Sequence, residues 1–137
     1  MDKVRDAMVT EPRALPVDAS AQAAGEILAK PDVRAIYVTR DGRLVGVVTR
    51  KTLVREVVAP GLDPRATALG EVAELPHYTI GPDVSLDEAF RFLEVEDAER
   101  VPVVDDHGLL VGVLSRSVLQ RRLADDEPPD PDSQQQT

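Results

Sequence analysis

The sequence contains no cysteine, no tryptophan and only two histidines among its 137 residues. The absence of cysteine excludes disulfide bonds, thiol catalysis and thiolate metal ligands. Histidine is the commonest side-chain ligand of transition metals, so two isolated histidines argue against a metal centre. Aromatic residues make up 3% of the chain, which means that Val, Leu, Ile and Ala must form the hydrophobic core.

Long apolar runs are missing as well. No stretch approaches the roughly 20 apolar residues that a membrane-spanning helix needs. The first residues, MDKVRDAMV, carry too many charges for the apolar region of a secretory signal. We therefore expect a cytoplasmic protein with no membrane partner.

The charge balance is acidic, with 25 acidic residues, 16 basic residues and a net charge of −9. Five of the acidic residues lie in residues 125–137, which contain no basic residue. Residues 127–137 also lack apolar side chains, and this composition predicts a disordered acidic tail. Because binding to a nucleic-acid backbone requires a basic face, we do not expect nucleic acid as a partner.

One motif is present twice. Residues 42–50 read GRLVGVVTR, and residues 108–116 read GLLVGVLSR. A repeat of this length in a short chain indicates one supersecondary unit used twice. A single unit of half the chain buries little surface, so we expect the two units to share a core.

Each half carries helix and strand signals in the same order. In the first half they predict a helix over 21–30 capped by Ser20, strands at 35–39 and 44–48 joined at Asp41-Gly42, and a helix over 49–58. In the second half they predict a helix over 86–95 with a capping box from Ser85 and Glu88, strands at 101–104 and 109–114, and a helix over 115–123. Short segments at 4–8 and 69–72 lead the halves and precede extended stretches at 14–17 and 78–80. The expected domains are repeat 1 with its linker (1–66), repeat 2 (67–124) and the tail (125–137).

A tandem β-α-β-β-α unit that carries DGRLVGVVT resembles the cystathionine-β-synthase (CBS) domain, of which two copies form a Bateman module. VRDAM at 4–8 and VPVVD at 101–105 also resemble family segments, and the resemblance covers residues 4–124. It implies an α+β fold in which two repeats pack about a pseudo-two-fold axis, with small mixed sheets flanked by helices. It further implies a homodimer that binds AMP, ADP, ATP or S-adenosylmethionine in clefts between the repeats and regulates a separate effector protein.

Thr49 and Ser115 are the first candidates for ligand binding, because each lies where a strand gives way to a helix. A hydroxyl beside the unpaired N–H groups of a helix start suits a phosphate. Arg50 and Arg116 follow the two hydroxyls and could add charge-assisted contacts. The alternative is that both hydroxyls only cap their helices.

The resemblance also implies an aspartate three residues after each hydroxyl, where it accepts hydrogen bonds from a ribose. This sequence has Thr52 and Val118 at those positions. Thr52 can make one such bond and Val118 can make none, so ribose recognition is weakened in the first half and lost in the second. The second hypothesis is therefore a ligand-free dimerisation or interaction module.

An apolar base pocket around the second strand of each half is a further implication of the resemblance. The matching residues are Ala35, Ile36 and Tyr37 in the first half, and Val101, Pro102 and Val103 in the second. Tyr78, next to His77, could stack on an adenine, and Thr10 stands where family members often place a hydroxyl facing the cleft. Each apolar residue could equally belong to the core.

The sequence offers no catalytic constellation. It has no nucleophile beside a base and no phosphate-binding loop with a lysine. We therefore expect a regulatory module that binds an adenosine-containing ligand, and not an enzyme.

Overall fold

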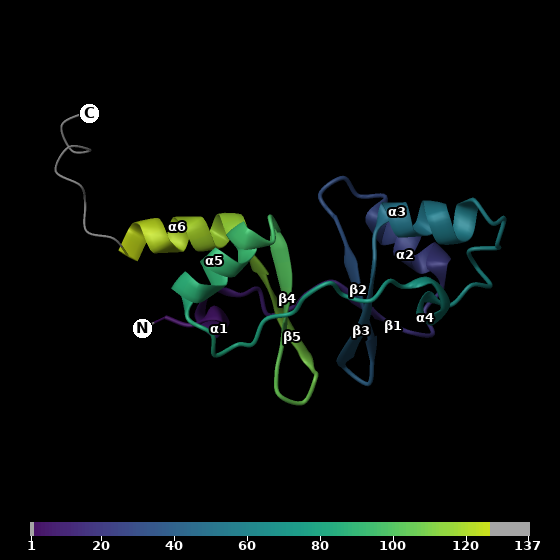
Figure 1. The fold of residues 1–137 in the computed structure, drawn as a ribbon. Coiled ribbons are helices and arrows are strands. Elements are labelled where there is room, and N and C mark those ends of the chain that lie inside the picture. Colours follow the sequence, from purple (N-terminus) through teal and green to yellow (C-terminus); the bar gives the residue numbers. More distant parts are fainter. Residues whose placement is uncertain (1, 127–137) are drawn as a thin grey trace, which may run out of the picture.

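The computed structural model describes residues 2–126, which form two lobes side by side (Figure 1). The first lobe contains β1 (Ala14–Pro16), α2 (Ala21–Leu28), β2 (Ile36–Arg40), β3 (Arg43–Val48) and α3 (Arg50–Leu53), which continues into the π-helical turn η1 (Val54–Val58). The second lobe contains α5 (Leu86–Val95), β4 (Arg100–Val104), β5 (Leu110–Ser115) and α6 (Arg116–Asp126). Two short helices, α1 (Val4–Ala7) and α4 (Leu69–Val72), lead the two halves. The predicted α+β class is confirmed.

Each lobe contains a small sheet. In the first, β1 is parallel to β2 and β2 is antiparallel to β3, so this sheet is mixed. In the second, β4 and β5 form an antiparallel pair. The strand expected at 78–80 is reduced to a single parallel bridge between Ile80 and Val103. Gly81 and Pro82 follow immediately, and a proline cannot donate the backbone hydrogen bond that would extend the pairing.

The hydrophobic core is divided between the lobes, so the expectation of one shared core is wrong. Val4 of α1 is fully buried in the core of the second lobe, among side chains of α5, β4, β5 and α6. Leu69 and Val72 of α4 are buried in the core of the first lobe. The two halves thus exchange their leading helices, as the position of α1 in Figure 1 shows. Each lobe completes its core with a helix from the other half of the chain.

After each exchanged helix the chain crosses a strand of the repeated motif. The N–H of Val47 donates to the carbonyl of Glu74 at 2.8 Å, and the N–H of Glu74 donates to Val47 at 2.9 Å. Val9 and Val113 exchange the same pair of bonds at 2.9 and 3.0 Å. The motif therefore serves in both lobes as the docking edge for a segment that comes from the other half.

The tips of the two hairpins also meet. The N–H of Leu44 donates to the carbonyl of Gly108 at 3.1 Å, and the N–H of Leu110 donates to Gly42 at 3.0 Å. Asp41 and Gly42 have positive φ angles of 53° and 81°, as a tight hairpin turn at this dipeptide requires. The hairpin turns therefore hold the lobes together as well as reversing the chain.

Replacing Gly42 by alanine is expected to lower the free energy of unfolding by about 2 kcal/mol. A left-handed φ costs a residue with a Cβ about 1 kcal/mol, and the new Cβ would lie 3.2 Å from Cδ2 of Leu109 in the other hairpin. Gly61→Ala is the control, because Gly61 has a φ of 78° but nothing within 4 Å of the added Cβ. Denaturation with urea measures both variants. Equal losses would show that the added Cβ at position 42 meets no resistance from Leu109 in the other hairpin.

The linker between the halves closes the start of α2. Ser20 accepts a hydrogen bond from the N–H of Ala23 at 3.1 Å, which confirms the predicted N-cap. The next two amides donate to the linker, Ala21 to the carbonyl of Thr67 at 2.8 Å and Gln22 to that of Pro64 at 3.0 Å. The segment 59–67 is therefore an ordered cap on α2 as well as a connection.

The helix ends agree closely with the capping signals of the sequence. Ser85 accepts from the N–H of Glu88 at 3.2 Å, while in residues 2–126 no hydrogen bond from the N–H of Ser85 to the Glu88 side chain completes the capping box. The final helix extends to Asp126, and the tail from residue 127 onward lies outside the described residues. No helix within residues 2–126 is both long enough and apolar enough to cross a membrane.

Candidate functional site

A pocket of about 840 Å³, which we call the Thr49 pocket, lies between the two lobes. Three segments form its wall: the paired ends of β2 and β3 with Thr49, the crossing segment 74–78, and the loop that leads into β4. The lining residues are Arg34, Ala35, Tyr37, Val47, Thr49, Glu74, Leu75, Pro76, His77, Tyr78, Asp97, Ala98, Glu99, Arg100 and Pro102. A molecule in this pocket would contact both repeats.

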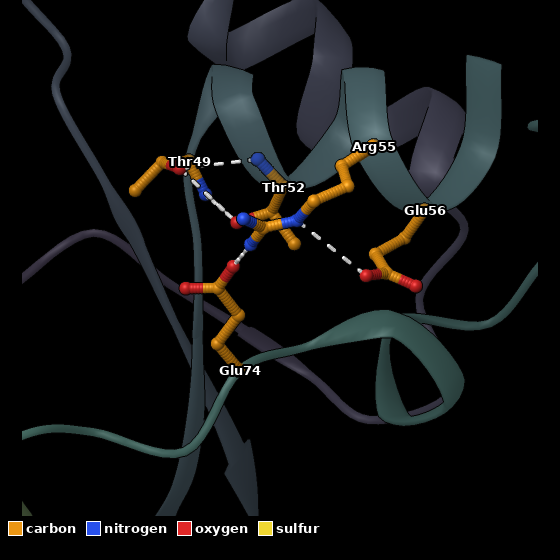
Figure 2. A network of polar contacts seen from close by, with 5 residues as sticks. All are labelled: Thr49, Thr52, Arg55, Glu56 and Glu74. Carbon is orange, nitrogen blue, oxygen red and sulfur yellow. Dashed lines mark hydrogen bonds and ion pairs between the residues drawn. The ribbon is translucent and has the colours of Figure 1, made fainter. Parts of the chain in front are cut away.

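Thr49 and Thr52 cap the start of α3 reciprocally (Figure 2). The N–H of Thr52 donates to Oγ1 of Thr49 at 3.2 Å, and the N–H of Thr49 donates to Oγ1 of Thr52 at 3.0 Å. The two hydroxyl oxygens are 3.0 Å apart, within hydrogen-bond distance. Thr52 is fully buried, whereas Thr49 is half-buried and lines the pocket. The capping interpretation of Thr49 is thus confirmed, and the residue also lines the pocket.

Arg55 reaches back from η1 toward the crossing segment (Figure 2). Its Nη2 donates to Oε1 of Glu74, and its Nε lies 3.6 Å from Oε1 of Glu56. Both partners of the Arg55–Glu74 pair are partly exposed, so the pair contributes little to stability. Its effect is to fix the Glu74 carboxylate at the pocket wall.

The two tyrosines of the chain both line the pocket. Burial raises the pKa of Tyr37 to about 12, with a further increase from Tyr78 and an opposing effect from the Arg100 guanidinium. Burial also raises the pKa of Tyr78, and the negative charge of Glu96 adds to this increase. The ring of Tyr78 packs edge-on against Phe92, with centroids 5.5 Å apart and planes at 82°. Both phenols are therefore neutral at physiological pH and can donate a hydrogen bond.

An alkaline titration of tyrosine absorbance is expected to show both phenols of the folded protein ionising above pH 10, with Tyr37 near pH 12. The folded pKa of Tyr37 exceeds the unfolded value, so its contribution to stability is complete below pH 10 and is lost as the pH rises through 12. Tyr37→Phe should remove the part of the alkaline loss of stability that comes from ionisation of Tyr37. The absence of tryptophan simplifies the absorbance measurement. Ionisation of both tyrosines at pH 10 in the folded protein would contradict the burial of Tyr37.

Five of the residues predicted for ligand binding come together at this pocket: Ala35, Tyr37, Thr49, Tyr78 and Pro102. Ile36 and Val101 have no exposed surface. Ile36 lies in the core of the first lobe and Val101 in the core of the second, so both are core residues. Thr52 lies behind Thr49 and has no exposed surface either. These three side chains do not reach the space between the lobes.

The remaining predicted residues lie elsewhere. Arg50 is exposed and donates from Nη2 to the carbonyl of Lys30 at 2.7 Å, beyond the end of α2. Thr10 is exposed on the segment that follows α1. Neither side chain lines the Thr49 pocket.

Ser115 and Arg116 occupy the start of α6. Oγ of Ser115 accepts from the N–H of Val118 at 3.2 Å and lies 3.0 Å from Oγ of Ser117. Nη1 of Arg116 is 3.5 Å from the carboxylate of Asp97, and its Nε is buried without a hydrogen-bond partner in the described part of the chain. Ser115 thus caps a helix as Thr49 does, but it does not line the Thr49 pocket.

Arg34, Arg100 and Glu74 also line the pocket, although the sequence did not lead us to expect them there. Arg34 and Arg100 stand at matching positions of the two repeats, 66 residues apart, and this alignment could have identified them. Glu74 follows a short leading helix, and its place at the pocket depends on the exchange of that helix between the lobes. No local pattern in the sequence indicates such an exchange.

Comparison with known proteins identifies the class. A family model described as the CBS domain matches residues 4–59 and 69–125. The chain therefore belongs to the CBS domain family and contains two tandem copies. Hypoxic response protein 1 of Mycobacterium tuberculosis is 31% identical over 102 residues, which cover 74% of this chain and 71% of that protein.

Solved structures agree with this assignment. The crystal structure of Hypoxic Response Protein I with two coordinated zinc ions superimposes with a TM-score of 0.74 at 28% identity, over 89% of this chain and 99% of that chain. The crystal structure of CBSX2 in complex with AMP gives a TM-score of 0.72 at 23% identity, over 90% and 96% of the two chains. Within residues 2–126 of this chain, no group of three or more His, Asp or Glu side chains is placed to hold a metal ion.

Proposed function

We propose that this protein is a regulatory module that binds an adenosine-containing ligand in the Thr49 pocket. The observation that carries the proposal is the pocket itself, which lies between the repeats and is lined by Thr49. The AMP complex of CBSX2, a structure of the same fold, supports this class of ligand. The module is cytoplasmic and not an enzyme in this proposal.

The lining of the pocket suits the parts of such a ligand. Tyr37 and Tyr78 offer aromatic faces and neutral phenols to a base. Arg34 and Arg100 offer guanidinium groups, which bind phosphate in bidentate fashion. A ligand held by both arginines would connect the loop before β2 with the first residue of β4, and so would favour one relative arrangement of the lobes.

The regulatory output in this proposal is a change in a homodimer that acts on a separate effector protein. The outer face of η1 supports association, because Val54, Val58 and Leu62 are 58%, 68% and 47% exposed. Exposed apolar side chains grouped on one helix and the turn that follows it are typical of an interaction surface. Light scattering with and without ligand would measure the association directly.

A thermal-shift series with AMP, ADP, ATP, NAD and S-adenosylmethionine tests the proposed function. A ligand at about 100 times its dissociation constant stabilises the folded state by about 2.7 kcal/mol. For a chain of 137 residues this corresponds to an increase in Tm of about 9 °C. No increase with any of the five at millimolar concentration would contradict the proposal.

The second candidate function is a ligand-free dimerisation or interaction module. It is favoured by Thr52, whose hydroxyl is buried in the capping network, and by Val118, which has no hydroxyl. This candidate predicts a stable dimer that nucleotides do not change. It also predicts that the double variant Thr49→Ala, Ser115→Ala assembles normally, since both hydroxyls would then serve only as caps.

A further inference from the structure

Glu74 is an acidic residue among those that line the Thr49 pocket. Its backbone is fixed by the two hydrogen bonds with Val47, at 2.8 and 2.9 Å, so the side chain starts from a well-defined position on the edge of β3. The side chain is 37% exposed. Glu74 therefore combines a rigid attachment with access to the space between the lobes.

Arg55 holds one oxygen of this carboxylate. Its Nη2 donates to Oε1, and Figure 2 shows the second oxygen of Glu74 directed away from the guanidinium. Within residues 2–126, no hydrogen bond is formed to that second oxygen, Oε2. A carboxylate has about four lone-pair sites, so Glu74 keeps acceptor capacity for more than one further donor.

The other groups around the pocket are less suited to accept hydrogen bonds from a ligand. The hydroxyl of Thr52 is fully buried and engaged with Thr49. Oε1 of Glu99 lies 3.4 Å from the N–H of Ser117, and the side chain of Asp97 is 96% exposed beside Arg116. Asp97 also has a basic partner, but at 3.5 Å and with a side chain that is 96% exposed, whereas the Glu74 side chain is 37% exposed, so Glu74 is the better held of these two carboxylates and still has an oxygen to offer.

We propose that Glu74 accepts hydrogen bonds from the vicinal ribose hydroxyls of the ligand, with Arg55 as its positioning residue. This inference rests on the proposed function and adds the group that recognises the sugar. Two adjacent hydroxyls are both donors, and a carboxylate can accept from both at once without donating itself. The carboxylate comes from the crossing segment and not from the helix that starts after Thr49.

Calorimetric titration of the full chain with AMP, 2′-deoxy-AMP and 3′-deoxy-AMP tests the inference. Wild-type protein is expected to bind AMP at least tenfold more tightly than either deoxy compound, because each of these lacks one donor to a charged acceptor. Glu74→Gln should weaken AMP binding about tenfold and reduce the preference over the deoxy compounds to less than about threefold. The matched control is Glu71→Gln, which removes the same charge from an exposed position on α4 outside the pocket lining and should behave as wild type.

The sign of the effect separates sugar recognition from simple electrostatics. Removing a negative charge from the pocket should strengthen the binding of an anion if Glu74 acts only through its charge. Tighter AMP binding by Glu74→Gln, or an unchanged preference for AMP over its deoxy compounds, would overturn the inference and leave the proposed function intact. Wild-type protein that binds AMP and both deoxy compounds equally would overturn it without any variant. Failure of wild-type protein to bind any adenosine compound would overturn both proposals.

Discussion

Replacing Gly112 by alanine is expected to lower the free energy of unfolding by about 3 kcal/mol. An added Cβ would lie 2.7 Å from the carbonyl oxygen of Val9 and 2.7 Å from Sδ of Met8. The sulfur can move, but the carbonyl belongs to the backbone around Val9 that pairs with Val113, so this stretch of backbone must itself shift. Overpacking of this kind costs about 1–3 kcal/mol, and here it also weakens two backbone hydrogen bonds. Denaturation with urea measures the loss.

Gly25→Ala is the matched control for this prediction. Gly25 lies inside α2, and an added Cβ would meet only Cδ1 of Leu53 at 3.8 Å, an ordinary contact. Because alanine is favoured over glycine within a helix, this variant should be more stable by about 0.5–1 kcal/mol. A Gly112→Ala protein as stable as wild type would show that the segment around Val9 does not lie against β5.

Thr49→Ala is expected to lower both stability and ligand affinity. Loss of the cap costs about 1 kcal/mol. The buried hydroxyl of Thr52 keeps the N–H of residue 49 as a donor but loses its side-chain partner, which costs about 1–2 kcal/mol more. Ligand affinity should fall about tenfold if the Thr49 hydroxyl contacts the ligand, as the loss of one good hydrogen bond requires. Thermal unfolding measures the first effect and calorimetry with AMP measures the second.

Ser115→Ala separates capping from binding. Ser115 caps α6 as Thr49 caps α3, but it does not line the Thr49 pocket. This variant should therefore lose about 1 kcal/mol of stability and keep its affinity for AMP. Equal losses of affinity in the two variants would show that binding does not depend on the Thr49 pocket.

Local signals in the sequence predicted most of the fold. The duplicated GRLVGVVTR motif indicated two equivalent units, and the predicted helices and strands agree with the structure to within one to three residues at most ends. Ser20, Thr49 and Ser85 each lie at the predicted helix start, because capping is decided by a few neighbouring residues. Hairpin turns are equally local, and Asp41-Gly42 was identified for that reason.

The long-range arrangement could not be predicted in the same way. Val4 and Leu69 look like ordinary members of their own halves, and nothing in their surroundings in the sequence shows that each packs in the other lobe. The structure places Glu74 at the pocket only through that exchange. Ile36 and Val101 were predicted at the pocket, but both face the core. Successive residues of a strand point to opposite sides, so a strand beside a pocket alternates between the pocket wall and the core.

A crystal structure of the protein with AMP tests the central claim most directly. The account predicts AMP between the two lobes, in contact with Thr49 and with at least one residue of the loop before β4. AMP bound at another surface, with the Thr49 pocket closed by its own side chains, would contradict the account.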